Sequence, residues 1–547
     1  MDTHLLDKIE TIFLVDNLHV MHNGIIASVI RKLRFMEDVW GYKPLLLVGN
    51  YNIEFKRMNI LLKYGGQQPD QTHFSESARI LNVFEYFQKA YVPEVTEAEY
   101  SLNLSEGETS KQTGNNVYAI YKNDEHIRTE YFIGLFGRLR MLEHFSGGKV
   151  NKRVFFDDAG CISMIQQVDV KNQDFHPSES YFTTDKRLCL IAEYIYDPKT
   201  HEDKNVLQKL TLFDKNGQVV KENTSKAELG ACCLDEICND PTKIYLIVDE
   251  SGVFTPAPLA VKRKNIFRCC VVHNIFLTDA YRLNSPPQKY YIHLCEHRNE
   301  FDGIIFLTMT ERTDFIKKYP GFDPRKAFVI PHPYAYSIKY ADFEKRNHKK
   351  AIMISRFDAT KQIPHAINLF KTVVDQIPDA ILEIYGFGFK YIEEEADRKI
   401  KELKLENNVK KMGFTDYPVE IMRGAAAFIM TSSVEGMPMT LVESICNGCP
   451  VFAYDINYGP ADTILDGVTG FLFTRGDSNS FAAKLIEYFL DINLQRRMSE
   501  NCYKDSDRFG YSRFLTRWGA FMESLYNRRR EMILKEISDE NINASEA

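Results

Sequence analysis

Two glutamates eight residues apart, Glu435 and Glu443, are the residues whose types and spacing say most about the chemistry of this chain. The apolar run 425–430 before them is typical of a buried strand, and the amphipathic run 440–446 is typical of a helix. A turn that contains Gly and Pro separates the two runs, so Glu435 is predicted in a loop at the carboxyl end of a strand, where open α/β sheets bind ligands. Glu443 is predicted about one turn into the helix, whose N-terminal N–H groups attract phosphate. The two carboxylates are therefore spaced to reach different parts of one ligand and not to chelate one metal ion.

Arg356 and Lys361 form a second charged pair, five residues apart, directly after the predicted strand 351–355. Two cations on one turn can neutralise a diphosphate and the charge that grows on it when a bond to it breaks. An Arg/Lys pair on a loop is more often simply solvated. Its position after a strand, upstream of the two glutamates, favours a role in phosphate binding.

These residues carry a resemblance to a known family. The sequence Ser-Ser-Val-Glu-Gly-Met-Pro around Glu435 and the sequence Gly-Cys-Pro-Val after Glu443 resemble the E-x7-E signature of retaining, nucleotide-sugar-dependent glycosyltransferases of the GT-B fold. Arg356 and Lys361 match the Arg-x4-Lys element of that family. The resemblance implies an α/β chain with two Rossmann-like domains that face a cleft.

The same resemblance implies roles for the matching residues. Arg356 and Lys361 would hold the diphosphate of a UDP-sugar, and Glu443 would accept hydrogen bonds from the ribose hydroxyls. Glu435 would contact the donor sugar and stabilise its oxocarbenium-like centre. The residues that follow it in the motif, Gly436 and Met437, are predicted to bind the same substrate.

Three glycines are weaker candidates for substrate binding. Gly24 lies between a predicted strand and a predicted helix, where the family usually has two glycines; here Asn23 replaces the first. Gly386 and Gly388 follow the predicted strand 380–385, and in the family this loop approaches the nucleotide. Glycine allows close approach of backbone to ligand, but an ordinary turn explains each position as well.

His273 ends an apolar strand and resembles the Val-His at the edge of the family's active site. It is predicted to hydrogen-bond the donor sugar or its phosphate, and it completes the predicted catalytic set with Glu435, Arg356 and Lys361. Taken alone, a histidine there is more often a core residue. His332, before a proline, is interpreted as structural.

The pattern of elements predicts two Rossmann-like domains with an insertion in the first. Strands and helices alternate at both ends of the chain, but from about 102 to 231 strand and turn patterns dominate, with an Asn216-Gly217 hairpin signal. The predicted boundaries are 1–100 with 236–338 for the N-terminal acceptor domain, 101–235 for an antiparallel β insertion, 339–508 for the nucleotide-sugar domain, 509–537 for a helix that crosses back, and 538–547 for a flexible tail.

Composition narrows the class of protein further. The chain has 547 residues and a net charge of −7, which argues against a general nucleic-acid binder. No apolar run approaches the roughly 18–20 residues of a membrane span, and residues 1–10 lack the apolar centre of a signal peptide, so a cytoplasmic location is predicted. The 11 cysteines show no disulfide framework, and Cys446 and Cys449 are interpreted as packing residues despite their C-x-x-C spacing.

A closer resemblance covers most of the chain. The segments 82–87, 354–356 and 452–460, together with the insertion, resemble the bacterial wall-teichoic-acid α-glycosyltransferases. That resemblance implies UDP-glucose or UDP-N-acetylglucosamine as donor, a poly(ribitol-phosphate) or poly(glycerol-phosphate) acceptor, no obligatory metal or other cofactor, and homo-oligomers in whose assembly the inserted sheet takes part.

Two other functions remain open. Enzymes that add N-acetylglucosamine to Ser/Thr-rich surface adhesins share this architecture, and so do non-catalytic partner subunits, although the latter lose the charged residues that this chain keeps. The cluster Arg528-Arg529-Arg530 on the last helix is a candidate for peripheral contact with an anionic membrane at the inner face of the cell membrane, though such a cluster is more often a solvated face.

Overall fold

The computed structural model describes two compact units, residues 4–268 and residues 269–547, whose boundary falls within strand β15 (Ile266–Val272). The residues that the structure describes are 8–17, 24–52, 77–89, 102, 104–133, 138–157, 160–199, 204–223, 225–250, 252, 254–334 and 338–546, and side chains are described for these residues except 24, 27, 133, 223 and 532–546. Asn23 lies outside these residues.

The first sheet is parallel and has the strand order β17-β16-β15-β14-β1-β2-β3. Most of its strands are short apolar runs, such as the buried Leu45–Val48, as expected where helices cover both faces. The other strands are β1 (Ile9–Val15), β3 (Arg79–Asn82), β14 (Ile244–Asp249), β16 (Gly303–Phe306) and β17 (Ala327–Val329), and β2 is Leu45–Val48. The associated helices are α2 (Gly24–Trp40), α4 (Val83–Gln88), α5 (Lys226–Ile237), α6 (Pro256–Ala260), α7 (Ile292–Glu296) and α8 (Met309–Lys318).

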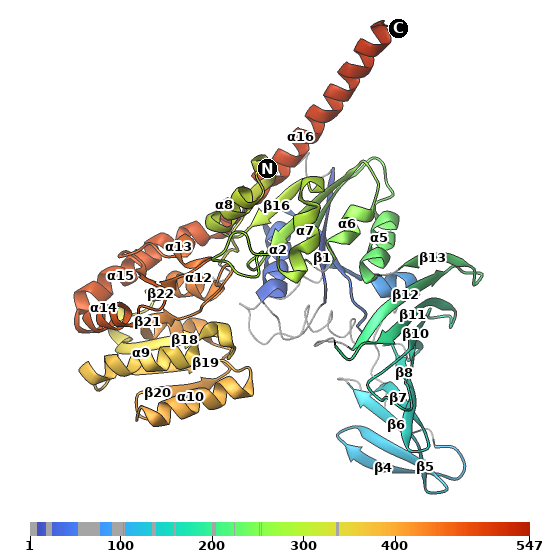
Figure 1. Ribbon diagram of the computed structural model, residues 1–547, viewed down its shortest axis with the longest axis horizontal. Coiled ribbons are helices and arrows are strands. Elements are labelled where there is room, and N and C mark those ends of the chain that lie inside the picture. Colours follow the sequence, from blue (N-terminus) through green and yellow to red (C-terminus); the bar gives the residue numbers. More distant parts are fainter. Residues whose placement is uncertain are drawn as a thin grey trace. The chain divides into compact units, whose positions relative to one another are not determined.

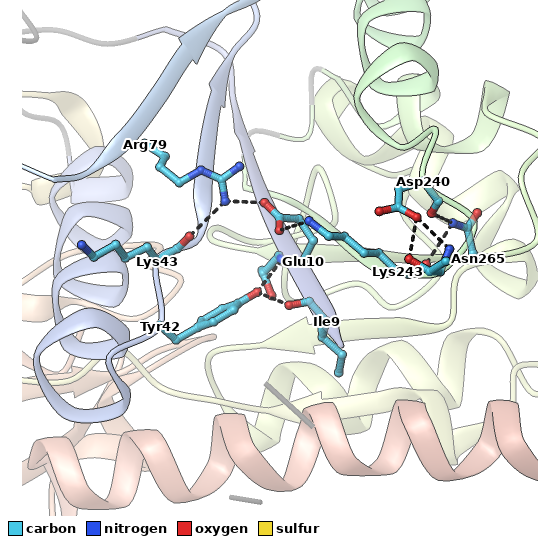
Figure 2. Close-up of polar contacts among 10 residues, drawn as sticks. Ile9, Glu10, Tyr42, Lys43, Arg79, Asp240, Lys243 and Asn265 are labelled. Carbon is cyan, nitrogen blue, oxygen red and sulfur yellow. Dashed lines mark hydrogen bonds and ion pairs between the residues drawn. The ribbon is translucent and has the colours of Figure 1, made fainter. Parts of the chain in front are cut away.

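A polar network ties the amino ends of β1, β3 and β14 (Figure 2). Glu10 of β1 forms ion pairs with Arg79 and, at 3.7 Å, with Lys243, the residue before β14. The hydroxyl of Tyr42 donates to the carbonyl oxygen of Ile9 at 2.9 Å. These contacts hold the strands together at the end of the sheet opposite to the one where α/β sheets bind ligands.

A buried ion pair fixes α2 at the carboxyl end of β14. The Nζ atom of Lys32 lies 2.7 Å from Oε1 of Glu250, and both side chains are almost completely buried. Burial lowers the pKa of Lys32, and the neighbouring charge of Glu250 opposes that shift. Gly24, one of the candidate glycines, is the first residue of α2 and therefore belongs to the first unit.

The predicted insertion is confirmed as a ten-stranded antiparallel sheet in which each strand pairs with its neighbours in sequence, from β4 to β13 (Figure 1). Its strands are β4 (Glu108–Gly114), β5 (Val117–Lys122), β6 (Glu125–Ile133), β7 (Arg138–Ser146), β8 (Lys149–Phe156), β9 (Ile162–Gln167), β10 (Ser178–Phe182), β11 (Leu188–Tyr196), β12 (Asn205–Phe213) and β13 (Val219–Asn223). The Asn-Gly turn joins β12 to β13 as predicted, with Gly217 at a φ of 77°.

Aromatic packing attaches the insertion to the first Rossmann-like sheet. The ring of Phe84 on α4 lies with its centroid 5.7 Å from that of Tyr51 and 5.0 Å from that of Tyr181 on β10. The amide of Gln88, at the end of α4, donates to the carbonyl oxygen of Ser163 on β9 at 2.9 Å. One short helix thus carries both the apolar and the polar part of the attachment.

The second parallel sheet has the order β20-β19-β18-β21-β22-β23 and forms the core of the predicted nucleotide-sugar domain. Its strands are β18 (Asn347–Ile354), β19 (Ile381–Tyr385), β20 (Val409–Gly413), β21 (Ala425–Met430), β22 (Val451–Asp455) and β23 (Gly470–Thr474). The helices are α9 (Ile363–Gln376), α10 (Lys390–Glu402), α11 (Pro418–Arg423), α12 (Met439–Cys446), α13 (Pro460–Thr463), α14 (Ser478–Leu490) and α15 (Ile492–Asp505). The chain therefore has the predicted GT-B architecture of two Rossmann-like sheets with a β insertion.

The last helix, α16 (Tyr511–Glu546), returns to the strands β16 and β17. The ring of Phe521 packs 4.8 Å from that of Phe328, and Arg528 donates to the carbonyl oxygen of Asp302 at 2.8 Å. The helix extends beyond residue 537, through most of the segment predicted as a tail. Among the residues that the structure describes, no helix is both long enough and apolar enough to cross a membrane. All 11 cysteines are free thiols.

Replacement of Phe84 by Ala should detach the insertion from its support. The side chain is buried at the centre of the attachment, and loss of such a ring costs about 3–5 kcal/mol of unfolding free energy. The measurement is urea unfolding together with limited proteolysis of the insertion. Val220→Thr, at a site 60% exposed on β13, is the control and should change stability by less than about 0.5 kcal/mol. Equal proteolysis of wild type and Phe84→Ala would contradict this account of the attachment.

Candidate functional site

The predicted turn between strand and helix is confirmed at the end of β21. The strand is buried at all six positions and ends at Met430, and α12 begins at Met439 after Pro438. No side chain caps this helix start with a hydrogen bond, so the capping position leaves its first N–H groups to other acceptors. Glu435 lies in the connecting loop, and Glu443 is half-buried in the second turn of α12.

Lys361 and Glu435 form the central contact of the site. The Nζ atom of Lys361 lies 2.6 Å from Oε1 of Glu435, and the two side chains are 16% and 14% exposed. Lys361 ends a short 3₁₀ helix after β18, and Glu435 follows β21. Because β18 and β21 pair in parallel, the loops that follow them emerge side by side. The sequence predicted both residues but not their contact.

Backbone contacts hold these two loops in register. The N–H of Ser433 donates to the carbonyl oxygen of Thr360 at 2.7 Å, and the hydroxyl of Thr431 donates to the carbonyl oxygen of Lys361 at 3.1 Å. Burial and hydrogen bonding together fix the carboxylate and the ammonium before any ligand binds. Such preorganisation lets charges act on a reacting group without first reorganising.

Arg356 lies on the same loop as Lys361 but is much more open to solvent. Its guanidinium group is 82% exposed and lies 3.4 Å from a carboxylate oxygen of Asp358. The carboxylate of Asp358 also accepts the N–H of Thr360 at 2.9 Å and so shapes the turn between the two cations. The loop thus presents one exposed cation and one cation already paired with a carboxylate.

Close backbone packing explains Gly386 and Gly388. A Cβ atom on Gly386, whose φ is 126°, would lie 1.9 Å from the carbonyl oxygen of Ser355. A Cβ atom on Gly388 would lie 2.3 Å from the carbonyl oxygen of Phe357. These glycines let the loop after β19 pack directly on the loop that carries Arg356, and contact of the same loop with a nucleotide stays a prediction.

Gly436 brings the motif loop against the end of β15. A Cβ atom there would lie 2.4 Å from the carbonyl oxygen of His273 and 2.9 Å from Cα of Asn274. The hydroxyl of the buried Tyr291 accepts the N–H groups of His273 and Asn274, at 3.0 and 3.2 Å. His273 is therefore held by its backbone beside the loop of Glu435. Met437, the next residue, is half-buried and packs against the core of the second sheet.

His332 lies beside His273, whereas the sequence alone predicts only a structural role for it. Nδ1 of His273 lies 3.3 Å from Nε2 of His332, and the two rings stack with centroids 5.2 Å apart. One ring nitrogen of this pair must donate and the other accept, so the two imidazoles set each other's tautomers. His332 follows β17 and His273 follows β15, and only the sheet brings these ends together. The sequence signal that could have identified His332 as a site residue is a histidine flanked by prolines directly after a strand.

Glu311 is a buried carboxyl group that the sequence did not single out. It lies on α8, is completely buried, and accepts the N–H of Phe276 at 3.1 Å through Oε1. Its Oε2 atom has no hydrogen-bond partner among the described residues. Burial raises the pKa of Glu311 well above its usual range, and the charges of Asp314 and Asp462 add to the shift. It supports the segment that follows His273.

Comparisons with known proteins agree with the fold and the order of motifs. Residues 339–505 match the family described as Glycosyl transferases group 1. The chain is 22% identical over 532 residues to a poly(glycerol-phosphate) alpha-glucosyltransferase of Bacillus subtilis, a similarity that covers 95% of this chain and 76% of the relative. It is 27% identical to a poly(ribitol-phosphate) alpha-N-acetylglucosaminyltransferase of Staphylococcus aureus, over 61% of this chain and 65% of the relative.

Solved structures extend the similarity to the whole architecture. The crystal structure of TarM superposes with a TM-score of 0.77 at 19% identity and covers 94% of this chain and 98% of TarM. The GtfA/B complex superposes with a TM-score of 0.69 at 16% identity and covers 95% of this chain and all of the matched chain. Both therefore share the fold, with similarity that extends across the β insertion.

Replacement of Glu311 by Gln should stabilise the protein increasingly as pH rises. Below the usual pKa of a carboxyl group, Glu311 is protonated in the folded and unfolded states alike. Above that value the unfolded state ionises first, so the wild type loses stability until the pH reaches the raised folded-state pKa. Glutamine has no such loss, and the difference should grow by up to about 1.4 kcal/mol per pH unit.

Urea unfolding of both proteins at about pH 5 and about pH 7 measures this difference, because other titrating groups cancel between them. The Gln variant keeps the acceptor for Phe276. A stability difference that is the same at both pH values would show that Glu311 is ionised in the folded protein.

Proposed function

From the premise that this chain is a GT-B glycosyltransferase of group 1 with an antiparallel β insertion, we propose that it transfers glucose or N-acetylglucosamine from a UDP-sugar to a polyol-phosphate polymer, with retention at the anomeric carbon. The preorganised contact between Lys361 and Glu435, 2.6 Å apart at the carboxyl ends of β18 and β21, is the observation that carries the proposal. This end of a parallel sheet is where α/β proteins bind nucleotides.

The charges at the site suit a sugar diphosphate. Arg356 is exposed and able to turn toward phosphate oxygens, and Lys361, on the same loop, is paired with Glu435 of the loop after β21. As the bond to the diphosphate breaks, negative charge grows on phosphate and positive charge grows on the sugar. The two cations stabilise the first and the carboxylate of Glu435 stabilises the second. Glu443, in the second turn of α12, is assigned to the ribose hydroxyls.

In the reaction, the bond between the anomeric carbon and the β-phosphate oxygen breaks, and a bond to an acceptor hydroxyl forms on the same face of the sugar. The acceptor proton passes to the departing phosphate, so atoms and charges balance without a cofactor. His273, held beside the loop of Glu435, is assigned to a hydrogen bond with the donor. Gly436 and Met437 are assigned to the wall of the substrate site, and contact of Gly24 with the diphosphate stays a prediction.

Known relatives support this choice of substrates. The relatives with 22% and 27% identity carry names that specify glucose and N-acetylglucosamine transfer to poly(glycerol-phosphate) and poly(ribitol-phosphate). A solved structure of S. aureus TarM, with a TM-score of 0.75 and 19% identity, contains UDP and α-GlcNAc-glycerol. The alternative acceptor is a Ser/Thr-rich adhesin, because a GtfA subunit of a peptide N-acetylglucosaminyltransferase from Streptococcus agalactiae is 23% identical over 70% of this chain.

The purified chain should transfer sugar from UDP-glucose or UDP-N-acetylglucosamine to poly(glycerol-phosphate) or poly(ribitol-phosphate), measured by incorporation of labelled sugar. Glu435→Gln and Lys361→Met should each lower kcat by about 10²–10³, as loss of one preorganised electrostatic group does. Glu394→Gln, on the exposed face of α10, is the matched control and should be unaffected.

Each contrary outcome identifies a different alternative. Transfer only to a Ser/Thr-rich peptide would place the chain among adhesin-modifying enzymes. Absence of transfer for every donor and acceptor, with UDP-sugar binding also absent by calorimetry, would favour a non-catalytic partner subunit. Transfer that survives in Glu435→Gln would remove this residue from the catalytic assignment.

Replacement of His332 tests whether the histidine pair serves the reaction. His332→Ala should lower kcat by about 2–10-fold with little change in KM for the UDP-sugar, because the loss of one hydrogen bond is worth about 0.5–1.5 kcal/mol. His332→Asn, which keeps a hydrogen-bonding group near His273, should recover part of the loss. Equal activity of wild type and His332→Ala would leave His332 with the structural interpretation.

A further inference from the structure

The short helix α7 and the residue that ends it, His297, present two histidines and a glutamate on one face, outside the site described above. We propose that His293, Glu296 and His297 bind a divalent transition-metal ion, with Zn²⁺ as the best match. Their ligand atoms, one from each side chain, all lie within 4.8 Å of one another, and all three residues are exposed. The proposal is independent of the transferase activity.

The backbone places the two histidines one helical turn apart. The N–H of His297 donates to the carbonyl oxygen of His293 at 3.0 Å, which closes the last turn of α7. Residues three and four positions apart lie on the same face of a helix, so Glu296 and His297 both stand next to His293. Ligand atoms around a tetrahedral Zn²⁺ are about 3.3–3.5 Å apart, given Zn–N distances near 2.0–2.1 Å. Exposed side chains reach that spacing by small rotamer changes.

The buried face of α7 fixes the orientation of the helix and thereby keeps the three side chains on its exposed face. Leu294 and Cys295 are buried, and Tyr291, the residue before the helix, is buried with its hydroxyl bonded to the N–H groups of His273 and Asn274. The helix therefore cannot rotate without disrupting the core. The three ligands are held on the outer face before a metal ion arrives, which lowers the entropic cost of binding.

Glu300 supplies a second and independent indication of a metal site. Its Oε1 atom lies 2.7 Å from Nδ1 of His297. A proton on Nδ1 that is donated to this carboxylate leaves Nε2 as the unprotonated nitrogen, which is the form that coordinates a metal ion. Metal-binding histidines in proteins commonly carry such a carboxylate on the other ring nitrogen.

The ligand set selects the class of ion. Imidazole nitrogens favour Zn²⁺, Cu²⁺ and Ni²⁺, whereas Mg²⁺ and Ca²⁺ require mostly oxygen ligands. Two imidazoles and one carboxylate provide three of the four positions of a tetrahedral zinc site. Water completes the coordination.

The test uses the full-length chain without an affinity tag, treated with chelator and dialysed. Zn²⁺ is titrated by calorimetry, and Co²⁺ is titrated by visible absorption, which reports four-coordinate nitrogen and oxygen ligation. We expect one binding event that disappears in the double variant His293→Ala/His297→Ala. Glu300→Gln should weaken it by about 10–100-fold, as loss of an outer carboxylate does. Mg²⁺ should give no such event.

Asn299→Ala is the matched control, because Asn299 is exposed in the same segment and is not part of the cluster. It should bind Zn²⁺ as the wild type does. The chain has 14 histidines and 11 cysteines, so only the binding that the double variant removes counts for this site. Identical Zn²⁺ isotherms for the wild type and the double variant, with unchanged circular dichroism, would overturn the proposal.

Discussion

The parallel pairing of β18 with β21 is the constraint on which the candidate site depends. The two strands are separated in sequence by β19 and β20 but lie side by side in the sheet. Their carboxyl ends therefore place Lys361 and Glu435 in contact, although 74 residues of chain separate them. The hydrogen bonds between the two loops hold the carboxylate and the ammonium at this distance.

Close approach of backbones is the second organising feature. Gly388 permits the loop after β19 to lie on the loop that carries Arg356. Gly436 permits the loop of Glu435 to reach the backbone of His273. A side chain at either position would collide with a carbonyl oxygen. Both glycines are thus required for backbone packing, apart from any contact with a substrate, and this packing by itself restricts which residues can replace them.

The β insertion leaves and rejoins the first unit without disturbing its parallel sheet. The chain departs after α4 and returns at α5, and α4 itself packs against the insertion through Phe84 and Gln88. Because every strand of the insertion pairs with its sequence neighbour, the sheet requires no crossover connection. Large insertions of this kind are compatible with a Rossmann-like core because the ends of the loop that they extend stay in place.

The amino-acid sequence by itself determined the order of the two parallel sheets, the presence of an antiparallel insertion, and the placement of Glu435 and Lys361 on loops after strands. These features follow from local patterns, since apolar runs, Gly/Pro turns and charged pairs are read within a few residues. Strands with mixed or polar sequences escaped prediction. The edge strand β4, with the sequence Glu-Thr-Ser-Lys-Gln-Thr-Gly, forms because its backbone pairs with β5 and not because it buries side chains.

Only the tertiary structure decided which of these residues meet. The contact of His273 with His332, the contact of Lys361 with Glu435, and the burial of Glu311 each join segments that are distant in the chain. Local propensity carries no information about such contacts, because they depend on which strands are neighbours and on how closely backbones can approach.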